Sequence, residues 1–397
     1  MNQNTPTPVW DLGPLGWLAP ALAEEVTRTG AALGQSFAAQ FSDPAHAGKY
    51  FQSLRRARAA LHDACWPSPT LKNMLAAPAH DLASLSQRLD HAMNRMPALR
   101  APIAPVRVQI PNRQGELQDA WRAAPRTRPL GALAERLAEL TALGMTPLLF
   151  GSLAEPGPWP AYADVDLAVL IDRRAAADPS ALERLVHVFE RVRPLLCQID
   201  PLQHHGPYIL FESDADCYLE SLLPAATLRR ATTLGAPALE LALTPVEDRL
   251  FSLLALLGAM RGALDLAARP ARLGDRFSAK YLCSLVLLLP ALACACLGKP
   301  TEKSLSFAQI KTELGPREIE TLEGFERLRR EWRWTLAPPR VLLTVAGRRA
   351  HFVARNVNRW PAPTLARWLA AGTPRLPALF NALLERIVRQ AREGATP

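Results

Sequence analysis

The stretch that decides the fold is Pro147–Ile171, which reads PLLFGSLAEPGPWPAYADVDLAVLI. A short apolar run turns at Gly151 and Ser152, and a second apolar run begins around Asp164 and Asp166. Side chains alternate across a strand, so residues two apart share a face. We therefore expect two strands joined by a turn, with both carboxylates on the same face at one strand end.

The residue types in this stretch suit phosphate and metal chemistry. A glycine in a turn lets the backbone approach a ligand closely, and a serine offers a hydroxyl and an N–H to a phosphate. Two adjacent carboxylates repel unless a cation lies between them, and Mg²⁺ takes one or two carboxylates plus substrate phosphates. Asp200, at the end of the predicted strand Leu195–Ile199, is expected to supply a third carboxylate.

The surrounding sequence predicts an α+β protein with a small mixed β-sheet. Strands are expected at Val106–Ile110, Pro147–Phe150, Val165–Ile171 and Tyr208–Phe211, and helices at Leu130–Leu143 (ended by Gly144) and Ala181–Arg193. Strands that alternate with helices indicate a sheet with helices packed on it. The predicted divisions are an N-terminal helical region and linker (1–120), the core (121–223) and a C-terminal helical domain (224–397).

Composition limits the classes of protein. The net charge of +9 favours an anionic partner, such as a nucleotide, a nucleic acid or an acidic membrane surface, although arginine-rich helices give the same charge without function. The six cysteines lack the spacing of a zinc site and fit a reducing, cytoplasmic protein. The apolar run Leu282–Leu297 is short and contains Pro290, so we expect a buried core helix and no membrane span.

The runs Leu149–Ser152 and Asp164–Leu167 resemble the nucleotidyltransferase superfamily, which includes DNA polymerase β and the aminoglycoside nucleotidyltransferases. That family has an apolar strand, Gly-Ser, a spacer, Asp-x-Asp on a strand and a later Asp. The resemblance is that of a divergent member and covers about 130–214 in detail. It implies that Gly151 and Ser152 hold a triphosphate.

The resemblance also implies that Asp164, Asp166 and Asp200 are catalytic and bind two Mg²⁺ ions. The expected reaction moves a nucleoside monophosphate, AMP from ATP, to a hydroxyl acceptor and releases pyrophosphate. A small molecule, a protein side chain, a nucleotide and an RNA end all remain open as acceptors, and the oligomeric state is open too.

Two departures from the family pattern support a different function. Many relatives carry a basic residue three positions after the serine, but this chain has Glu155, and the proline-rich loop 156–160 is rigid. The alternative is a catalytically inactive nucleotidyltransferase-fold module that binds a nucleotide, a nucleic acid or a protein partner. A nucleotide-sugar transferase using Asp-x-Asp is a third hypothesis, which the upstream Gly-Ser turn disfavours.

Other residues are weaker candidates. Relatives place a lysine of the helical domain on the triphosphate, which points to Lys280, with Lys303 in reserve. His204 is a candidate for contact with the nucleotide or acceptor, although we slightly favour a polar turn between strands. A metal site made by His204 and His205 is not expected, because adjacent residues of a strand face opposite sides.

A basic and aromatic segment follows near the C-terminal end. Arginines between Arg327 and Arg340 are interleaved with Trp332 and Trp334. Such a pattern binds single-stranded nucleic acid by charge and stacking, or forms an exposed helix face with the tryptophans packed inward. We favour inward packing.

Overall fold

The computed structural model describes residues 61, 62, 65, 105–123, 127–155, 159, 161–220, 223–245, 249–268, 275–360 and 362–393. The helices predicted for the first hundred residues lie outside this part, apart from Leu61, His62 and Cys65, which are helical. The described residues form helices and two small sheets, which confirms the α+β class.

The larger sheet has four strands in the order β4-β3-β2-β5. These strands are β2 (Met145–Phe150), β3 (Asp166–Ile171), β4 (Tyr208–Phe211) and β5 (Thr232–Thr233). β3 pairs antiparallel with β2 and parallel with β4, so the sheet is mixed, and the predicted strands around Gly151 and the aspartates are confirmed.

A second sheet pairs β1 (Val106–Ile110) with β6 (Leu239–Leu243) in antiparallel register. Both strands fall outside the predicted core of 121–223, and β5 also follows residue 223 while pairing with β2. The helical character predicted from residue 224 onward is therefore interrupted by two strands, after the short helix α10 (Ala225–Arg229).

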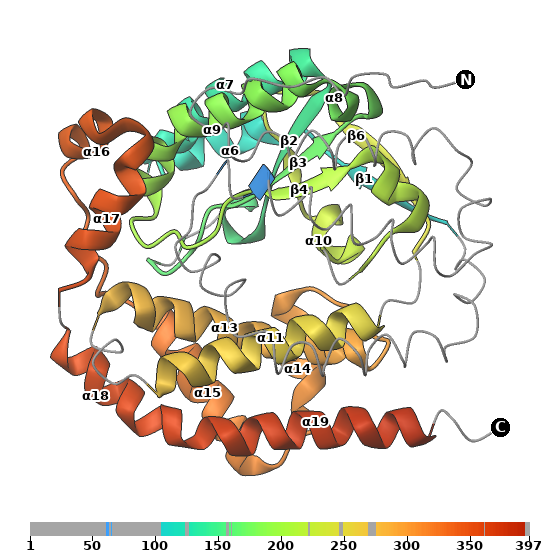
Figure 1. Ribbon diagram of the computed structural model, residues 1–397, viewed down its shortest axis with the longest axis vertical. Helices are drawn as coiled ribbons and strands as arrows, with labels where there is room; N and C mark the ends of the chain where they lie inside the picture. Colours follow the sequence, from blue (N-terminus) through green and yellow to red (C-terminus); the bar gives the residue numbers. More distant parts are fainter. Residues whose placement is uncertain are drawn as a thin grey trace, which may run out of the picture.

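Helices cover one face of the larger sheet, as the upper part of Figure 1 shows. They are α6 (Gln114–Ala123), α7 (Pro129–Leu137), α8 (Arg173–Ala177) and α9 (Pro179–Ile199). Leu149 and Val169 pack with these helices, whereas Leu148 and Ala168 pack with β1, β6 and α10. This alternation is the one expected for strands buried on both faces.

The C-terminal end of α9 corrects the sequence analysis. The predicted helix Ala181–Arg193 lies within α9, but α9 continues through Pro194 to Ile199, so the predicted strand Leu195–Ile199 is wrong. An apolar run this short fits either element by periodicity alone. Asp200 therefore ends a helix, and its N–H donates to the Leu196 carbonyl at 2.8 Å.

The remaining helices form a layer on the other side of the molecule (Figure 1). They are α11 (Arg249–Ala267), α13 (Arg276–Cys296), α14 (Lys303–Lys311), α15 (Pro316–Arg330), α18 (Pro363–Gly372) and α19 (Leu376–Glu393). α16 (Arg340–Ala346) and α17 (Ala350–Asn358) instead pack beside α9. α13 is long and apolar enough to cross a membrane, but 83% of its apolar window is buried inside the protein, as expected of a core helix.

The tryptophans of the basic segment differ in their surroundings. Trp332 is buried, and its ring centroid lies 5.3 Å from that of Tyr162 and 5.4 Å from that of Trp334. Inward packing is therefore confirmed for Trp332. Trp360, in contrast, is 68% exposed.

Candidate functional site

The turn after β2 contacts the start of β3 directly. Phe150 pairs with Asp166 in the antiparallel register, which brings Gly151 beside the Asp166 carboxylate. Gly151 has a φ of 69°, and a Cβ there would lie 2.2 Å from Asp166 Oδ2. Glycine is therefore required both by the left-handed backbone and by the close approach of the carboxylate. Ser152 follows in the short 3-10 helix η3 (Gly151–Ala154) and is half-buried.

A buried glutamine holds the aspartates against the loop that follows α9. Gln203 Oε1 accepts from the Val165 N–H at 3.0 Å, and Gln203 Nε2 donates to the carbonyls of Val165 at 3.0 Å and His205 at 2.9 Å. Val165 separates Asp164 from Asp166, so this one side chain fixes both to the loop. Gln203 was not predicted as a site residue, and its position next to two histidines in the sequence is the signal that could have found it.

Lys280 lies between two of the predicted aspartates. Its Nζ is 2.6 Å from Asp164 Oδ1 and 2.7 Å from Asp200 Oδ2, and the lysine side chain is 1% exposed. Burial lowers the pKa of Lys280, but the carboxylates of Asp164 and Asp200 outweigh it and raise the pKa above its usual range. Burial likewise opposes ionisation of Asp164, yet Lys280 holds the pKa of that carboxyl far below its usual range. The three groups therefore form a buried ion triad.

Tyr162 anchors this triad on α13. Its hydroxyl donates to the Lys280 carbonyl at 3.0 Å and lies 2.6 Å from Ser284 Oγ. Its ring centroid is 5.1 Å from Lys280 Nζ. The sequence analysis missed this residue, because nothing local in the sequence marks it as a neighbour of a helix more than a hundred residues away.

The triad does not fit the predicted pair of Mg²⁺ ions. An ion bridging Asp164 and Asp200 would need the space that the Lys280 ammonium fills, and Asp200 is 0% exposed. The neighbouring strand offers no replacement, because β4 consists of Tyr208, Ile209, Leu210 and Phe211. Asp164 and Asp166 come together beside the Gly151 turn as predicted, but Asp200 faces Lys280 instead of an open site.

The two histidines face the aspartates together. His204 Nδ1 lies 3.6 Å from Asp164 Oδ1, and His205 Nε2 lies 3.4 Å from Asp166 Oδ1. They belong to a loop and not to a strand, so the expectation that adjacent histidines face opposite sides does not hold here. Asp164, His204 and His205 each place one ligand atom within 4.8 Å of the others.

The environment of each histidine sets its charge. Burial outweighs the opposing charge of Asp164 and lowers the pKa of His204 to about 3, so this ring is neutral. Burial also acts against protonation of His205, but the hydrogen bond and charge of Asp166 raise its pKa to about 9. At neutral pH, His205 is therefore a cation paired with Asp166, and His204 is an uncharged neighbour of Asp164.

Cations from the helical layer approach the same carboxylates. Lys303, at the start of α14, is exposed to solvent. Desolvation by the surrounding protein, and then the charge of Arg329, lower the pKa of Lys303, whereas the charges of Asp164 and Asp166 raise it. Lys303 is therefore near enough to Asp164, Asp166 and Arg329 for their charges to act on it. Lys303, the reserve candidate for contact with a phosphate, is better placed than the buried Lys280.

The charge of Glu155 is compensated. Arg230 Nε donates to Glu155 Oε1 at 2.6 Å, and Arg230 Nη1 also contacts Glu302, which precedes α14. The glutamate that departs from the family pattern thus connects the Gly151 turn to the helical layer. Its repulsion of a phosphate is reduced accordingly.

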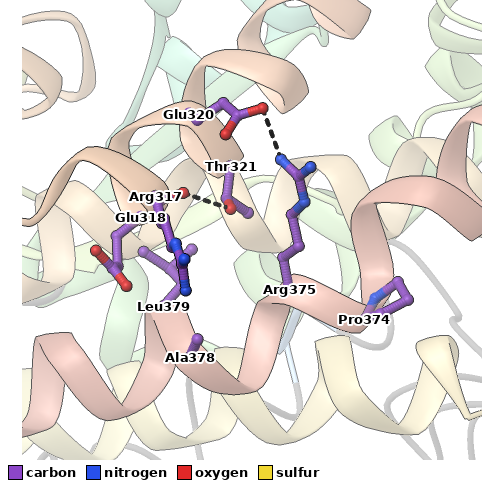
Figure 2. A pocket seen from close by; sticks show the side chains of 8 residues that line it. All are labelled: Arg317, Glu318, Glu320, Thr321, Pro374, Arg375, Ala378 and Leu379. Atoms are coloured by element: carbon purple, nitrogen blue, oxygen red, sulfur yellow. Dashed lines mark hydrogen bonds and ion pairs between the residues drawn. The ribbon is translucent and has the colours of Figure 1, made fainter.

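A separate polar hollow of about 430 Å³ lies between α15 and α19 (Figure 2). Arg375 Nη1 pairs with Glu320 Oε1 at 2.8 Å across it, and Thr321 Oγ1 donates to the Arg317 carbonyl at 2.9 Å. Its lining includes none of the predicted site residues. The aspartate and histidine cluster is therefore the candidate site.

No protein-family model, curated protein or solved structure matches the chain. The function is therefore inferred from the geometry of the side chains described above.

Proposed function

We propose that this protein is a nucleotidyltransferase-like module that binds a nucleoside triphosphate, ATP in the first instance, without transferring its nucleotidyl group. The observation that carries the proposal is the Lys280 ammonium, 2.6 Å from Asp164 and 2.7 Å from Asp200. Two-metal transfer needs ions that clamp the attacking and leaving oxygens. A protein ammonium fixed between these carboxylates neutralises them but offers no open coordination position.

Displacement of Lys280 by a divalent ion would be costly. The ammonium is buried, and removing one partner of a buried ion pair typically costs about 3–5 kcal/mol. The Tyr162 hydroxyl further fixes the backbone of Lys280. An incoming Mg²⁺ would also lose the waters that it keeps in most protein sites.

Three features support a phosphate ligand at the turn. Gly151 is exposed at the turn, and Ser152 adds a hydroxyl. Lys303, at the start of α14, adds an exposed positive charge on which Asp164 and Asp166 act. The Glu155 carboxylate is paired with Arg230 and does not oppose the ligand with its full charge.

Binding is tested with ATP and a matched pair of glycine variants. Gly151→Ala places a methyl group against Asp166 and distorts the turn, so we expect ATP affinity to fall by about tenfold or more, which corresponds to about 1.4 kcal/mol. Gly347→Ala is the control, because Gly347 also has a positive φ (51°) but nothing lies within 4 Å of its added Cβ. Calorimetric titration measures both. Equal ATP affinity in the two variants would place the nucleotide elsewhere.

Catalysis by Asp164 and Asp166 is the second candidate function. These carboxylates remain 14% and 27% exposed, so substrate-bound Mg²⁺ still has access to them. The test is transfer of label from each α-³²P-labelled nucleotide to acceptors in cell extract, with Mg²⁺ present. We expect no transfer above that of Asp164→Ala/Asp166→Ala. Label transfer that the wild type performs and the double variant does not would show that the protein is a nucleotidyltransferase and not a binding module.

A further inference from the structure

The pairing of Asp164 with His204 leaves two buried polar atoms poorly satisfied. Asp164 Oδ1 forms an ion pair with Lys280, but within the described part of the chain neither this oxygen nor His204 Nδ1 has a hydrogen-bond partner of ordinary geometry. The two atoms face each other at 3.6 Å. Buried polar atoms normally have a partner, and each exception needs an explanation. Of these two atoms, His204 Nδ1 is the one left without any partner among the described residues, and a cation bound beside Asp164 would supply one.

The spacing of these atoms suits a tetrahedral transition metal. Ligand atoms 2.0–2.2 Å from Zn²⁺ in a tetrahedron lie about 3.4 Å from one another. The Asp164–His204 pair is already close to that separation, at 3.6 Å, and all three ligand atoms of the cluster lie within 4.8 Å of one another. Closure around an ion therefore needs a movement of about 1 Å by the third ligand, His205, which a side-chain rotation supplies.

His205 is oriented as a metal ligand would be. Its Nδ1 lies 3.0 Å from the Gly206 carbonyl, which fixes that nitrogen as the donor and leaves Nε2 directed at the aspartates. Histidines that bind metals usually donate their other ring nitrogen to a carbonyl or carboxylate in this way. Gln203 holds the same loop against Val165, so the ligands are positioned by buried hydrogen bonds.

The charges of the cluster leave room for a divalent ion. Asp164 and Asp200 contact the Lys280 ammonium, whereas Asp166 contacts His205, whose Nε2 must release its proton to bind a metal. Asp200 offsets the repulsion that Lys280 would exert on a second cation. A carboxylate oxygen has more than one lone pair, so Asp164 contacts Lys280 and a metal ion at the same time.

We propose that Asp164, His204 and His205 form a binding site for one divalent transition-metal ion such as Zn²⁺. Asp166 Oδ1 lies 3.4 Å from His205 Nε2, and this carboxylate is the candidate for a fourth protein ligand. Two imidazoles with a carboxylate select Zn²⁺ and its neighbours over Mg²⁺, which prefers oxygen ligands. Asp164 Oδ1 already contacts Lys280 Nζ at 2.6 Å, so the ion and the ammonium would share this oxygen.

Zn²⁺ alone, without nucleotide, is the probe, so the result does not depend on the proposed function. Calorimetric titration of the nucleotide-free, chelator-treated full chain is expected to show one Zn²⁺ per chain and no Mg²⁺ binding at the same concentration. In His204→Gln/His205→Gln the affinity should fall by about tenfold or more. His187→Gln is the matched control, because His187 is 51% exposed on α9 and contacts Glu183 and Glu190. It should bind Zn²⁺ as the wild type does.

A Co²⁺ titration gives a second readout of the same site. Tetrahedral Co²⁺ bound through nitrogen and oxygen absorbs in the visible range, and we expect this absorption in the wild type and in His187→Gln but not in the double variant. Circular dichroism shows whether the double variant is folded; should it unfold, the single variant His204→Gln takes its place. The proposal is overturned by no Zn²⁺ binding in the wild type, by equal binding in the folded histidine variant, or by an equal loss in His187→Gln.

Discussion

Replacing Lys280 by methionine tests the buried triad directly. Methionine fills most of the lysine's volume but lacks its charge, so Asp164 and Asp200 would face each other without a counter-ion. Both carboxylates lie within 2.7 Å of the ammonium, and the lysine side chain is 1% exposed. Removal of one partner from a buried ion pair costs about 3–5 kcal/mol. We expect Lys280→Met to lower the free energy of unfolding by that amount at pH 7.

The assay is urea unfolding followed by circular dichroism in the presence of a chelator. Lys311→Met is the control, because Lys311 also contacts a carboxylate, that of Glu323, at 2.7 Å, but its side chain is 35% exposed. Exposed ion pairs contribute about 1 kcal/mol or less. The difference between the two variants therefore reports the burial of Lys280 and not the loss of a lysine as such.

A second substitution separates charge from packing. Adding Asp200→Asn to Lys280→Met removes one of the two unpaired carboxylates while keeping the oxygen that accepts from the Leu202 N–H at 3.0 Å. The double variant should be more stable than Lys280→Met by about 1–3 kcal/mol. If Lys280→Met is as stable as the wild type, or if Asp200→Asn destabilises it further, the ammonium does not hold these carboxylates together.

Three further predictions concern single residues. Gln203→Leu leaves the N–H and C=O of Val165 unpaired, so we expect the free energy of unfolding to fall by about 2–4 kcal/mol. Amide hydrogen exchange at Val165 should be faster; unchanged exchange would contradict the role of the Gln203 hydrogen bonds. Gly235→Ala should lower the free energy of unfolding by about 2 kcal/mol, because Gly235 has a φ of 65° and its added Cβ would lie 2.2 Å from the Cβ of Ala138. An unchanged melting temperature would show that the backbone at Ala138 moves to accommodate the methyl group. Burial raises the pKa of Cys283 to about 12, so its alkylation at pH 8 should require unfolding, and equal rates with and without denaturant would disprove its burial.

The elements nearest the Gly-Ser turn could be predicted because their signals are local. Pro147–Phe150 lies within β2, and Tyr208–Phe211 matches β4. Each is a short apolar run next to a turn residue, and Gly144 ends the preceding helical stretch with a φ of 76°. The positions of these strands follow from periodicity and turn chemistry.

The sequence predictions were wrong or incomplete where local signals conflict, or where the contacting residue is distant in the sequence. Pro194 suggested the end of a helix, yet α9 continues through it because the residues after it are buried with the helix: Leu196, Cys197 and Ile199. β5 and β6 were missed because short strands in a helix-rich region have weak periodicity. The contact between Asp200 and Lys280 spans 80 residues. Neither neighbourhood contains a signal that the two side chains meet in the interior.

The length of α9 connects these errors to the chemistry of the site. A strand at 195–199 would have presented Asp200 at a sheet edge beside Asp166, where hard ions and phosphates bind. The helix instead ends with Asp200 in the interior, where an isolated carboxylate is costly unless it is paired. Lys280 meets that need and, through the same ammonium, also neutralises Asp164. The loop after α9 then brings His204 and His205 to the aspartates, so the ligands near the Gly151 turn change from carboxylates alone to imidazoles with a carboxylate. That change of ligand type is the physical reason to expect one divalent transition-metal ion such as Zn²⁺, and not a pair of Mg²⁺ ions, in this protein.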